Sequence, residues 1–301
     1  MIALFGKIIG IFSVFVLLTS CSGNPVKDEN NTEAWIPLFN NKDLSGWDVK
    51  ITGHALNDNY KNTFRWEDSM LRVVYNDYDS FSNKFGHIYS QTSYSYYKLS
   101  FQYRFTGNSL SDAPEWAHKN SGVMLHSQSA ASMNISQAFP VSLETQFLEG
   151  SRSGQSTTGN LCTPGTQVHI NGILMQDHCI NSSSNKFVGD QWVNVVVEVY
   201  GDSLVRHIIN GDSVLTYTNA EIGGGFVSQS LDWTSADITD SAFWISKANT
   251  PLKEGHIAFQ AESQPIDFRN IKLLELEGCM DPKAKNYKNY YVKGNKKKCR
   301  Y

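Results

Sequence analysis

Strict alternation of apolar and polar side chains is the feature of this chain that most restricts its fold. In residues 98–105 every second side chain is leucine or an aromatic ring, and in 192–200 every second side chain is valine. Side chains of a strand alternate between its two faces, so both segments predict strands with one face in a core. No helix-period run of useful length lies between such segments. The pattern therefore favours an all-β, antiparallel β-sandwich over a βαβ fold.

Further segments read as strands, and turn signals join several of them. Residues 200–203 and 209–212 each connect two strands closely enough for a hairpin, and Asn210-Gly211 favours a type I′ turn. The stretches 107–119, 150–166 and 221–252 predict long loops, which in compact domains are usually functional. The predicted strands are 70–74, 86–91, 97–105, 122–126, 141–148, 167–170, 192–200, 204–209, 213–218, 255–261 and 268–275.

Two of these strands carry polar side chains on one face. Alternation places Asn120 and His126 on the same side of one strand, with Gly122 and Met124, and places Glu144 and Gln146 on the same side of the next. The opposite sides are apolar and face a core, so the polar sides meet water or a polar ligand. A carboxylate, an imidazole and carboxamides together suit a sugar ring or its proton-transfer chemistry. The alternative is an ordinary solvated sheet face.

The N-terminus predicts export and lipidation. Lys7 precedes the apolar run 8–18, which is too short to span a membrane and ends at Leu18-Thr19-Ser20-Cys21. This ending resembles the bacterial lipobox, so 1–20 is expected to be a signal peptide and Cys21 the lipidated residue. Residues 21–34 are expected to form a flexible tether. The protein would then be lipid-anchored in the cell envelope, on the periplasmic or the surface side of an outer membrane; the alternative is an ordinary signal peptide with a chance cysteine.

Cysteine usage agrees with an oxidising compartment. Four cysteines remain beside Cys21: Cys162, Cys179, Cys279 and Cys299. Three pairings are possible, and the local pairing of Cys162 with Cys179 and of Cys279 with Cys299 is favoured. A zinc site built from the first pair with His169 and His178 is the alternative, although its spacing lacks the usual signature.

Charge is concentrated at the C-terminus. Residues 279–301 carry a formal charge of +7, whereas the rest of the mature chain carries −11. No aromatic platform or helix accompanies the basic residues, and the compartment argues against nucleic acid. The segments Gly278-Cys-Met-Asp-Pro-Lys-Ala-Lys-Asn-Tyr287 and Cys299-Arg-Tyr301 resemble a small disulfide-closed module of bacterial secreted proteins. Residues 278–301 are therefore expected to form a separate module, in which Lys296–Lys298 replace the usual acidic residues.

The main domain, 35–277, resembles the 3-keto-disaccharide hydrolase family. Each matching block alone is not specific, but the order and spacing of the blocks together are. These blocks are 35–47 (WIPLFNNKDLSGW), 64–71 (FRWEDSML), 120–123 (NSGV), 143–146 (LETQ), 189–192 (GDQW), 207–211 (HIING), 255–260 (GHIAFQ) and 268–272 (FRNIK). The insert 150–188 is longer than usual, and His126 stands where the family often has arginine.

The resemblance implies a jelly roll of the concanavalin A-like lectin and glucanase type, and action on glycosides oxidised to a ketone at C3. Such a ketone acidifies the C2 hydrogen, so a base can remove it and the enolate can expel the group at C1; water then adds back. This reaction needs one base and donors to the enolate and leaving oxygens, not a pair of carboxylates. Glu144 or His126 is expected as the base, and His207 or Arg206 as a donor. Residues expected to orient hydroxyls are Asn120, Gln146, Gln260 and Glu262.

Three function classes stay open at this stage: a keto-glycoside hydrolase or lyase, a non-catalytic lectin-like lipoprotein, and a structural surface protein. The expected partners are a carbohydrate and, through Cys21, a membrane, but no nucleic acid. No cofactor is predicted. A divalent cation held by Glu144, His126 and Glu262 is an open alternative that no ligand spacing supports.

Overall fold

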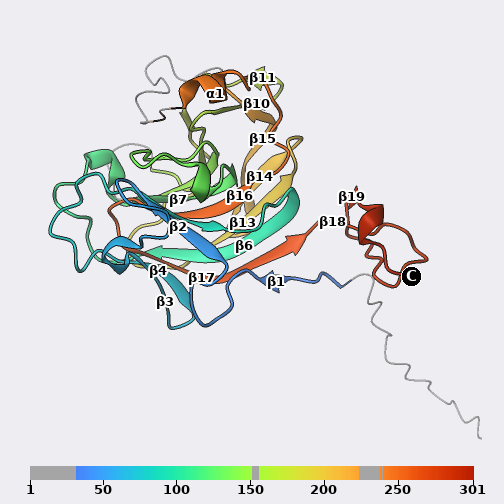
Figure 1. Cartoon of the computed structure of the whole chain (residues 1–301), viewed down its shortest axis with the longest axis horizontal. Helices are drawn as coiled ribbons and strands as arrows, with labels where there is room; N and C mark the ends of the chain where they lie inside the picture. Colours follow the sequence, from blue (N-terminus) through green and yellow to red (C-terminus); the bar gives the residue numbers. More distant parts are fainter. Residues whose placement is uncertain (1–31, 151–155, 224–237, 239) are drawn as a thin grey trace, which may run out of the picture.

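Two antiparallel sheets packed face to face make up the main domain in the computed structural model (Figure 1). The structure describes residues 32–150, 156–223, 238 and 240–301. The predicted signal peptide, Cys21 and most of the predicted tether lie outside the described residues. Among the described residues, no helix has the length and apolarity needed to span a lipid bilayer.

The larger sheet, here called sheet A, has ten strands within the described residues, and β1 (Ile36–Pro37) pairs with one side of β17. Its order is β11 (Ile173–Leu174), β10 (Thr166–Ile170), β15 (Asp212–Ile222), β14 (Val205–Ile209), β13 (Val193–Tyr200), β6 (Tyr96–Phe105), β17 (Ile266–Glu275), β4 (Met70–Val73) and β3 (Phe64–Glu67).

The second sheet, sheet B, has seven strands within the described residues. Its order is β12 (Cys179–Ile180), β9 (Asn160–Cys162), β8 (Leu143–Leu148), β7 (Asn120–Ser127), β16 (His256–Ala261), β5 (Gly86–Ser90) and β2 (Trp47–Ile51). The chain passes repeatedly from one sheet to the other, so the predicted antiparallel jelly-roll sandwich is confirmed. The remaining elements are short: β18 (Glu277–Gly278), β19 (Lys293–Gly294), helix α1 (Ser241–Ile245), and 3-10 turns at Tyr60–Asn62, Glu115–Ala117, Ala130–Ser132 and Lys296–Lys298.

Aromatic rings from both sheets form the core. Along β6, buried and half-buried side chains alternate without interruption, as the sequence predicts. Phe101 of β6 packs edge-to-face against Phe147, Phe259 and Phe268, with ring centroids 5.5–6.0 Å apart. Truncating one such ring to alanine typically costs about 3–5 kcal/mol. The predicted type I′ turn is also present, because Asn210 and Gly211 both have positive φ, at 50° and 96°.

The insert 150–188 widens both sheets at one edge. It supplies β9 and β12 to sheet B, and β10 and β11 to sheet A. Cys162 and Cys179 are direct register partners across β9 and β12, and their disulfide closes the insert. Since Cys162 also pairs with Glu144 of β8, the insert lies beside the strand that carries the predicted base.

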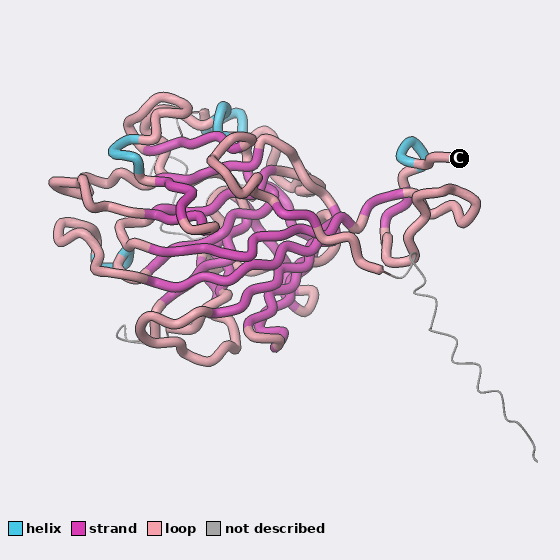
Figure 2. Tube along the Cα trace, turned by 90° about the horizontal axis from the view of Figure 1, so that it is seen from below, coloured by secondary structure: helices cyan, strands magenta, loops and turns pink. Residues whose placement is uncertain are grey.

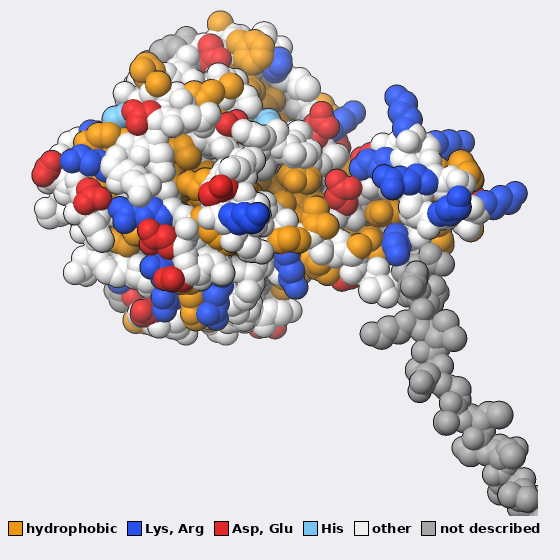
Figure 3. Space-filling view, turned by 60° about the horizontal axis from the view of Figure 1, so that its bottom comes forward, with side chains coloured by type: hydrophobic (Ala, Val, Ile, Leu, Met, Phe, Trp, Pro, Cys, Tyr) orange, Lys and Arg blue, Asp and Glu red, His pale blue; other side chains and the backbone are white. Residues whose placement is uncertain are grey.

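The C-terminal segment 278–301 stands beside the sandwich rather than in either sheet (Figures 1 and 2). The Cys279–Cys299 disulfide and the β18–β19 pair hold it together. Its basic side chains gather on its surface (Figure 3). The backbone amide of Ala34 donates to Tyr290 Oη at 3.3 Å, so the described chain begins next to this segment.

Candidate functional site

A row of polar side chains crosses the outer face of sheet B. Gln146 of β8 pairs with Gly122 of β7, and Gln260 of β16 pairs with His87 of β5. Phe259 pairs with Val123, so Gln260 lies beside Gly122. The opposite faces of these strands carry core residues such as Val123 and Phe259. The four strands therefore present Gln146, Gly122, Gln260 and His87 side by side, away from the core.

Glu144 reaches into this row because Gly122 has no side chain. Its register partner is Met124, one position further along the face. A Cβ atom built on Gly122 would overlap the Glu144 carboxyl group, so the carboxyl lies directly over the Gly122 backbone. Gly122 is flanked by Gln146 on one strand and Gln260 on the other, and the carboxyl is thus placed among carboxamides.

Several polar atoms on this face are buried without a hydrogen-bond partner. Within the described part of the chain these are Glu144 Oε1, Asn120 Oδ1, both amide atoms of Gln260 and both ring nitrogens of His87. Their side chains are only 0–6% exposed. Buried polar atoms in folded proteins are nearly always paired, and an unpaired one costs about 1–3 kcal/mol. Such a concentration on adjoining strands makes this face the candidate site for a polar ligand.

Burial also changes the protonation of the two titratable groups. It raises the pKa of the Glu144 carboxyl to about 8 and lowers the pKa of the His87 imidazole to about 3. His87 is therefore neutral near pH 7, with one nitrogen able to donate and the other able to accept. A carboxyl whose pKa lies near neutrality can both take up and return a proton, which is the property required of a general acid–base group.

The remaining predicted ligand-orienting residues lie on or beside the same face. Asn120 lies two residues before Gly122 on β7 and therefore on the same face. Its Nδ2 donates to Trp116 O at 3.1 Å. Gln146 Oε1 accepts from Asn160 Nδ2 at 3.3 Å. Glu262 directly follows β16 and is 2% exposed. The structure thus brings Asn120, Glu144, Gln146 and Gln260 together, with Glu262 at the end of the β16 strand.

His126 does not share this face, and the expectation that it lies on the same side as Met124 is wrong. The β7–β16 register shifts between His256 and Ala258, and His126 has a φ of 48°. This bulge turns the imidazole between the sheets. Its Nε2 donates to Gly201 O at 3.1 Å and its ring packs against Tyr97, a core residue of sheet A. Burial lowers the pKa of His126 to about 4.

The structure also separates His207 and Arg206 from the Glu144 face, because β14 belongs to sheet A. His207 points into the sandwich, where Nδ1 donates to Gly159 O at 2.9 Å and Nε2 lies 3.0 Å from Thr145 Oγ1. Burial lowers its pKa to about 4. Arg206 lies on the outer face of sheet A and pairs with Glu198 at 2.7 Å. Neither side chain can contact a sugar bound at Glu144.

Both predicted disulfides are present, Cys162–Cys179 and Cys279–Cys299. His178 lies close to the first pair, and these three residues form the one cluster of metal-type ligands found among the described residues. Its two sulfurs are joined to each other, so no thiolate is available for zinc. The set Glu144, His126 and Glu262 is not assembled either, since His126 faces the interior.

His87 is a candidate site residue that the sequence interpretation missed. The signal was present: in the strand Gly86–Ser90, alternation places His87 and Tyr89 opposite the core residue Ile88. Tyr89 packs with Met124 and Ala258 on the outer face of sheet B, which confirms the side on which His87 lies. Only the strand order shows that β5 adjoins β16, and hence that His87 faces Gln260.

The chain is similar to one protein family and, more distantly, to several solved structures. A family model described as a 3-keto-alpha-glucoside-1,2-lyase-like domain matches residues 34–274. No curated protein sequence matches the chain. A provisionally assigned glycosyl hydrolase from Parabacteroides distasonis ATCC 8503 has 17% sequence identity and a TM-score of 0.47, over 80% of this chain and 99% of that one. The carbohydrate-binding module CBM66 from Bacillus subtilis has 11% identity and a TM-score of 0.40, over 76% and 96%.

Proposed function

We propose that this chain, which belongs to the 3-keto-alpha-glucoside-1,2-lyase-like domain family, cleaves glycosides whose C3 hydroxyl has been oxidised to a ketone. The reaction takes place on the outer face of sheet B, with Glu144 as the base. The observation that carries this proposal is the buried carboxyl of Glu144, with its pKa of about 8, among unpartnered polar atoms of Gln260, His87 and Asn120.

Proton transfer from C2 begins the proposed reaction. Ionised Glu144 takes the C2 hydrogen as a proton, and the C2–H electron pair moves into an enolate with the C3 oxygen. The enolate then re-forms the ketone, a C1=C2 double bond forms and the C1–O bond breaks. The departing oxygen takes a proton from the Glu144 carboxylic acid, which returns the carboxylate to its starting state. Addition of water across C1=C2 completes hydrolysis; without it the product is an unsaturated keto sugar.

Hydrogen-bond donors on neighbouring strands support this sequence. Gln260 Nε2 and the protonated nitrogen of neutral His87 are unpartnered. Gln260 lies beside Gly122, and His87 lies next to Gln260 in the same row. Donors held in place before the reaction stabilise an enolate oxygen without reorganisation, and loss of one such donor typically costs about 10²–10³ in rate. Asn120 and Gln146 present further carboxamide atoms for sugar hydroxyls. The ordinary two-carboxylate glycosidase mechanism is not required, because a single base starts the elimination.

Release of the aglycone from a chromogenic 3-keto-glucoside tests the proposal. We expect release from the keto sugar and none from the matching unoxidised glucoside, because only the ketone acidifies C2. Mass spectrometry of the sugar product separates the two chemistries, since hydrolysis adds one water and elimination adds none. Binding of the keto sugar without release would contradict the enzyme and favour a lectin-like protein instead.

We further propose that Cys21 carries a lipid anchor and holds the protein in the bacterial cell envelope. The support is the Leu18-Thr19-Ser20-Cys21 sequence and an oxidising compartment, as both disulfides require. Metabolic labelling with a radioactive fatty acid tests the anchor. We expect label in the unmodified protein and none in Cys21→Ser; equal labelling of the two would contradict it.

A further inference from the structure

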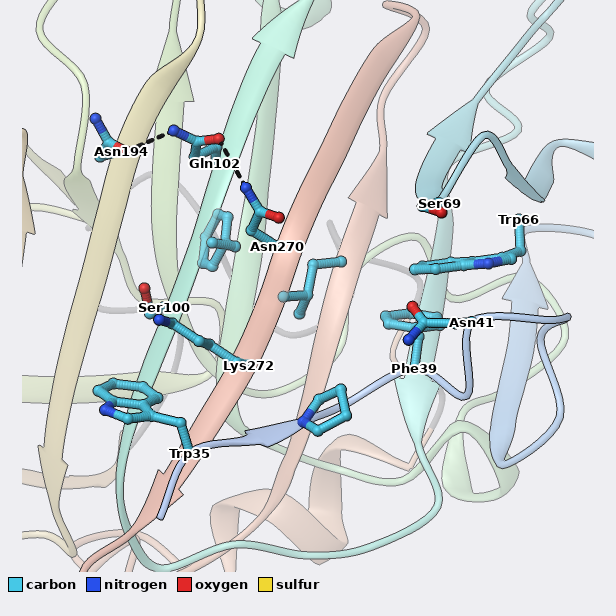
Figure 4. Close-up of a pocket in the computed structure, with 13 residues that line it drawn as sticks. Trp35, Phe39, Asn41, Trp66, Ser69, Ser100, Gln102, Asn194, Asn270 and Lys272 are labelled. Carbon is cyan, nitrogen blue, oxygen red and sulfur yellow. Dashed lines mark hydrogen bonds between the residues drawn. The ribbon is translucent and has the colours of Figure 1, made fainter. Parts of the chain in front are cut away.

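A cavity of about 520 Å³ opens on the outer face of sheet A and reaches the edge of the core at Phe39 and Trp66 (Figure 4). The proposed reaction does not use it. Its polar side chains on β6, β13 and β17 lie on the opposite side of the sandwich from Glu144, because each of them alternates with core residues of sheet A. Its volume is within the range of small-molecule sites. The side chains that matter for its chemistry are Trp35, Trp66, Gln102, Asn194, Asn270 and Lys272.

Carboxamides held by one another line one side of the cavity. Gln102 Nε2 donates to Asn194 Oδ1 at 2.7 Å, and Asn270 Nδ2 donates to Gln102 Oε1 at 3.1 Å (Figure 4). A register shift in β17 between Arg269 and Lys272 accompanies the φ of 55° at Asn270. This bulge brings Arg269 and Asn270, two successive residues, to the same partner, Gln102. The chain of amides is thus fixed before any ligand arrives.

Two tryptophans lie at opposite ends of the cavity (Figure 4). Trp66 stacks on Phe39 with centroids 4.9 Å apart, and Phe39 stacks in turn on Trp47 at 4.1 Å. Trp35 donates from Nε1 to Glu33 at 2.8 Å, and Lys272 Nζ lies 5.0 Å from its ring centroid. Both indoles are therefore held in place, which reduces the entropy lost on binding.

The charged side chains that line the cavity suit binding rather than acid–base catalysis. No aspartate or glutamate is among its described lining residues, and within the described chain Lys272 Nζ makes no ion pair. Aromatic rings pack against the C–H groups of a pyranose, while amides and an ammonium group bond its hydroxyls. Rings, amides and one cation with no carboxylate suit a neutral sugar better than a cationic ligand.

We propose that this cavity binds a pyranose unit of a neutral glycan and does not cleave it. The protein then has two carbohydrate sites on opposite faces of the sandwich. The sheet A cavity holds the protein on a glycan, and the sheet B face carries out the reaction. This proposal does not depend on the keto-glycoside chemistry.

Isothermal titration of the folded protein with maltotriose and with cellotriose, each at millimolar concentration, tests the cavity. We expect at least one of these probes to bind, and Trp35→Ala to weaken that binding about tenfold or more, because removal of an aromatic anchor can cost most of the affinity. Lys272→Met is expected to weaken binding to a smaller extent. Ile36→Ala is the matched control, since it removes an exposed apolar side chain from the same segment.

Cleavage of the keto sugar is measured on the same variants. Trp35→Ala and Lys272→Met are expected to cleave the keto sugar at the same rate as the unmodified protein. Absence of binding by both probes would overturn the proposal, and so would equal binding by Trp35→Ala, Lys272→Met and Ile36→Ala. Loss of binding in Glu144→Gln alone would assign the sugar to sheet B and would also overturn it.

Discussion

At the scale of single residues, burial of Glu144 costs the folded protein stability. Its carboxyl has a pKa of about 8, against an ordinary 4.5, because burial disfavours the charged form. The folded state therefore binds a proton that the unfolded state releases between pH 4.5 and 8. As far as Glu144 determines it, the free energy of unfolding is highest below pH 4.5. It falls as the pH rises from 4.5 to 8, by an amount on the order of 5 kcal/mol.

Glu144→Gln is accordingly expected to stabilise the protein in a pH-dependent manner. Below pH 4.5 the variant and the unmodified protein should have similar free energies of unfolding, because a protonated carboxyl and a carboxamide are both neutral. Above pH 8 the variant should be more stable, since it has no charge to bury. Urea unfolding below pH 4.5 and above pH 8 measures the two free energies of unfolding. If the variant and the unmodified protein differed by the same amount at both pH values, the raised pKa of Glu144 would be contradicted.

Gly122→Ala tests whether the position of the Glu144 carboxyl matters. The added methyl overlaps the end of a flexible side chain, so the carboxyl should move while the backbone stays. Displacement of a catalytic group by about 1 Å can cost 10²-fold in rate. We expect the rate of aglycone release to fall by about that factor with little change in melting temperature. Full activity at an unchanged melting temperature would show that the position of the carboxyl over Gly122 does not matter for the reaction.

At the scale of elements, the sequence predicted where the strands lie in the chain better than it predicted which strands pair with each other. Alternation identified β6, β13 and the polar face of β8 because each depends on local pattern alone. The order of the sheets depends on pairings between distant segments, so alternation could not show that β14 lies in sheet A and takes His207 away from Glu144. The bulge at His126 left no signal, since the residue fits the strand pattern and the register shift involves β16.

Gly255→Ala tests that bulge. A Cβ atom at Gly255 would overlap the His126 backbone, and Gly255 does not have a positive φ, so the cost is steric. Overpacking of this kind typically destabilises by about 1–3 kcal/mol. Denaturant unfolding should show this loss. Gly294→Ala is the matched control, because a Cβ there makes only ordinary contacts with Met280. Equal stability of the two variants would contradict the close approach.

At the scale of the whole molecule, the two disulfides stabilise different parts. Cys162–Cys179 closes the insert beside β8, whereas Cys279–Cys299 closes the basic C-terminal segment. The loops are of similar length, 17 and 20 residues in separation, so each link should contribute about 3 kcal/mol to the stability of its own region.

Removal of each disulfide by a pair of alanines should therefore separate stability from activity. Cys162→Ala with Cys179→Ala is expected to lower the melting temperature of the sandwich and the rate of cleavage, because β9 adjoins the Glu144 strand. Cys279→Ala with Cys299→Ala is expected to leave the rate unchanged. Calorimetry and the chromogenic assay measure both effects, and loss of activity in the C-terminal pair alone would contradict this division.

The central claim is that Glu144 removes the C2 hydrogen of a 3-keto sugar. Its most direct test is the rate of aglycone release from a keto-glucoside carrying deuterium at C2, measured for the unmodified protein and for Glu144→Gln. We predict that deuterium slows the unmodified protein and that Glu144→Gln loses about 10²–10⁴ in rate, as expected for loss of a general base. Release that is insensitive to deuterium, together with a Glu144→Gln variant as fast as the unmodified protein, would contradict the claim.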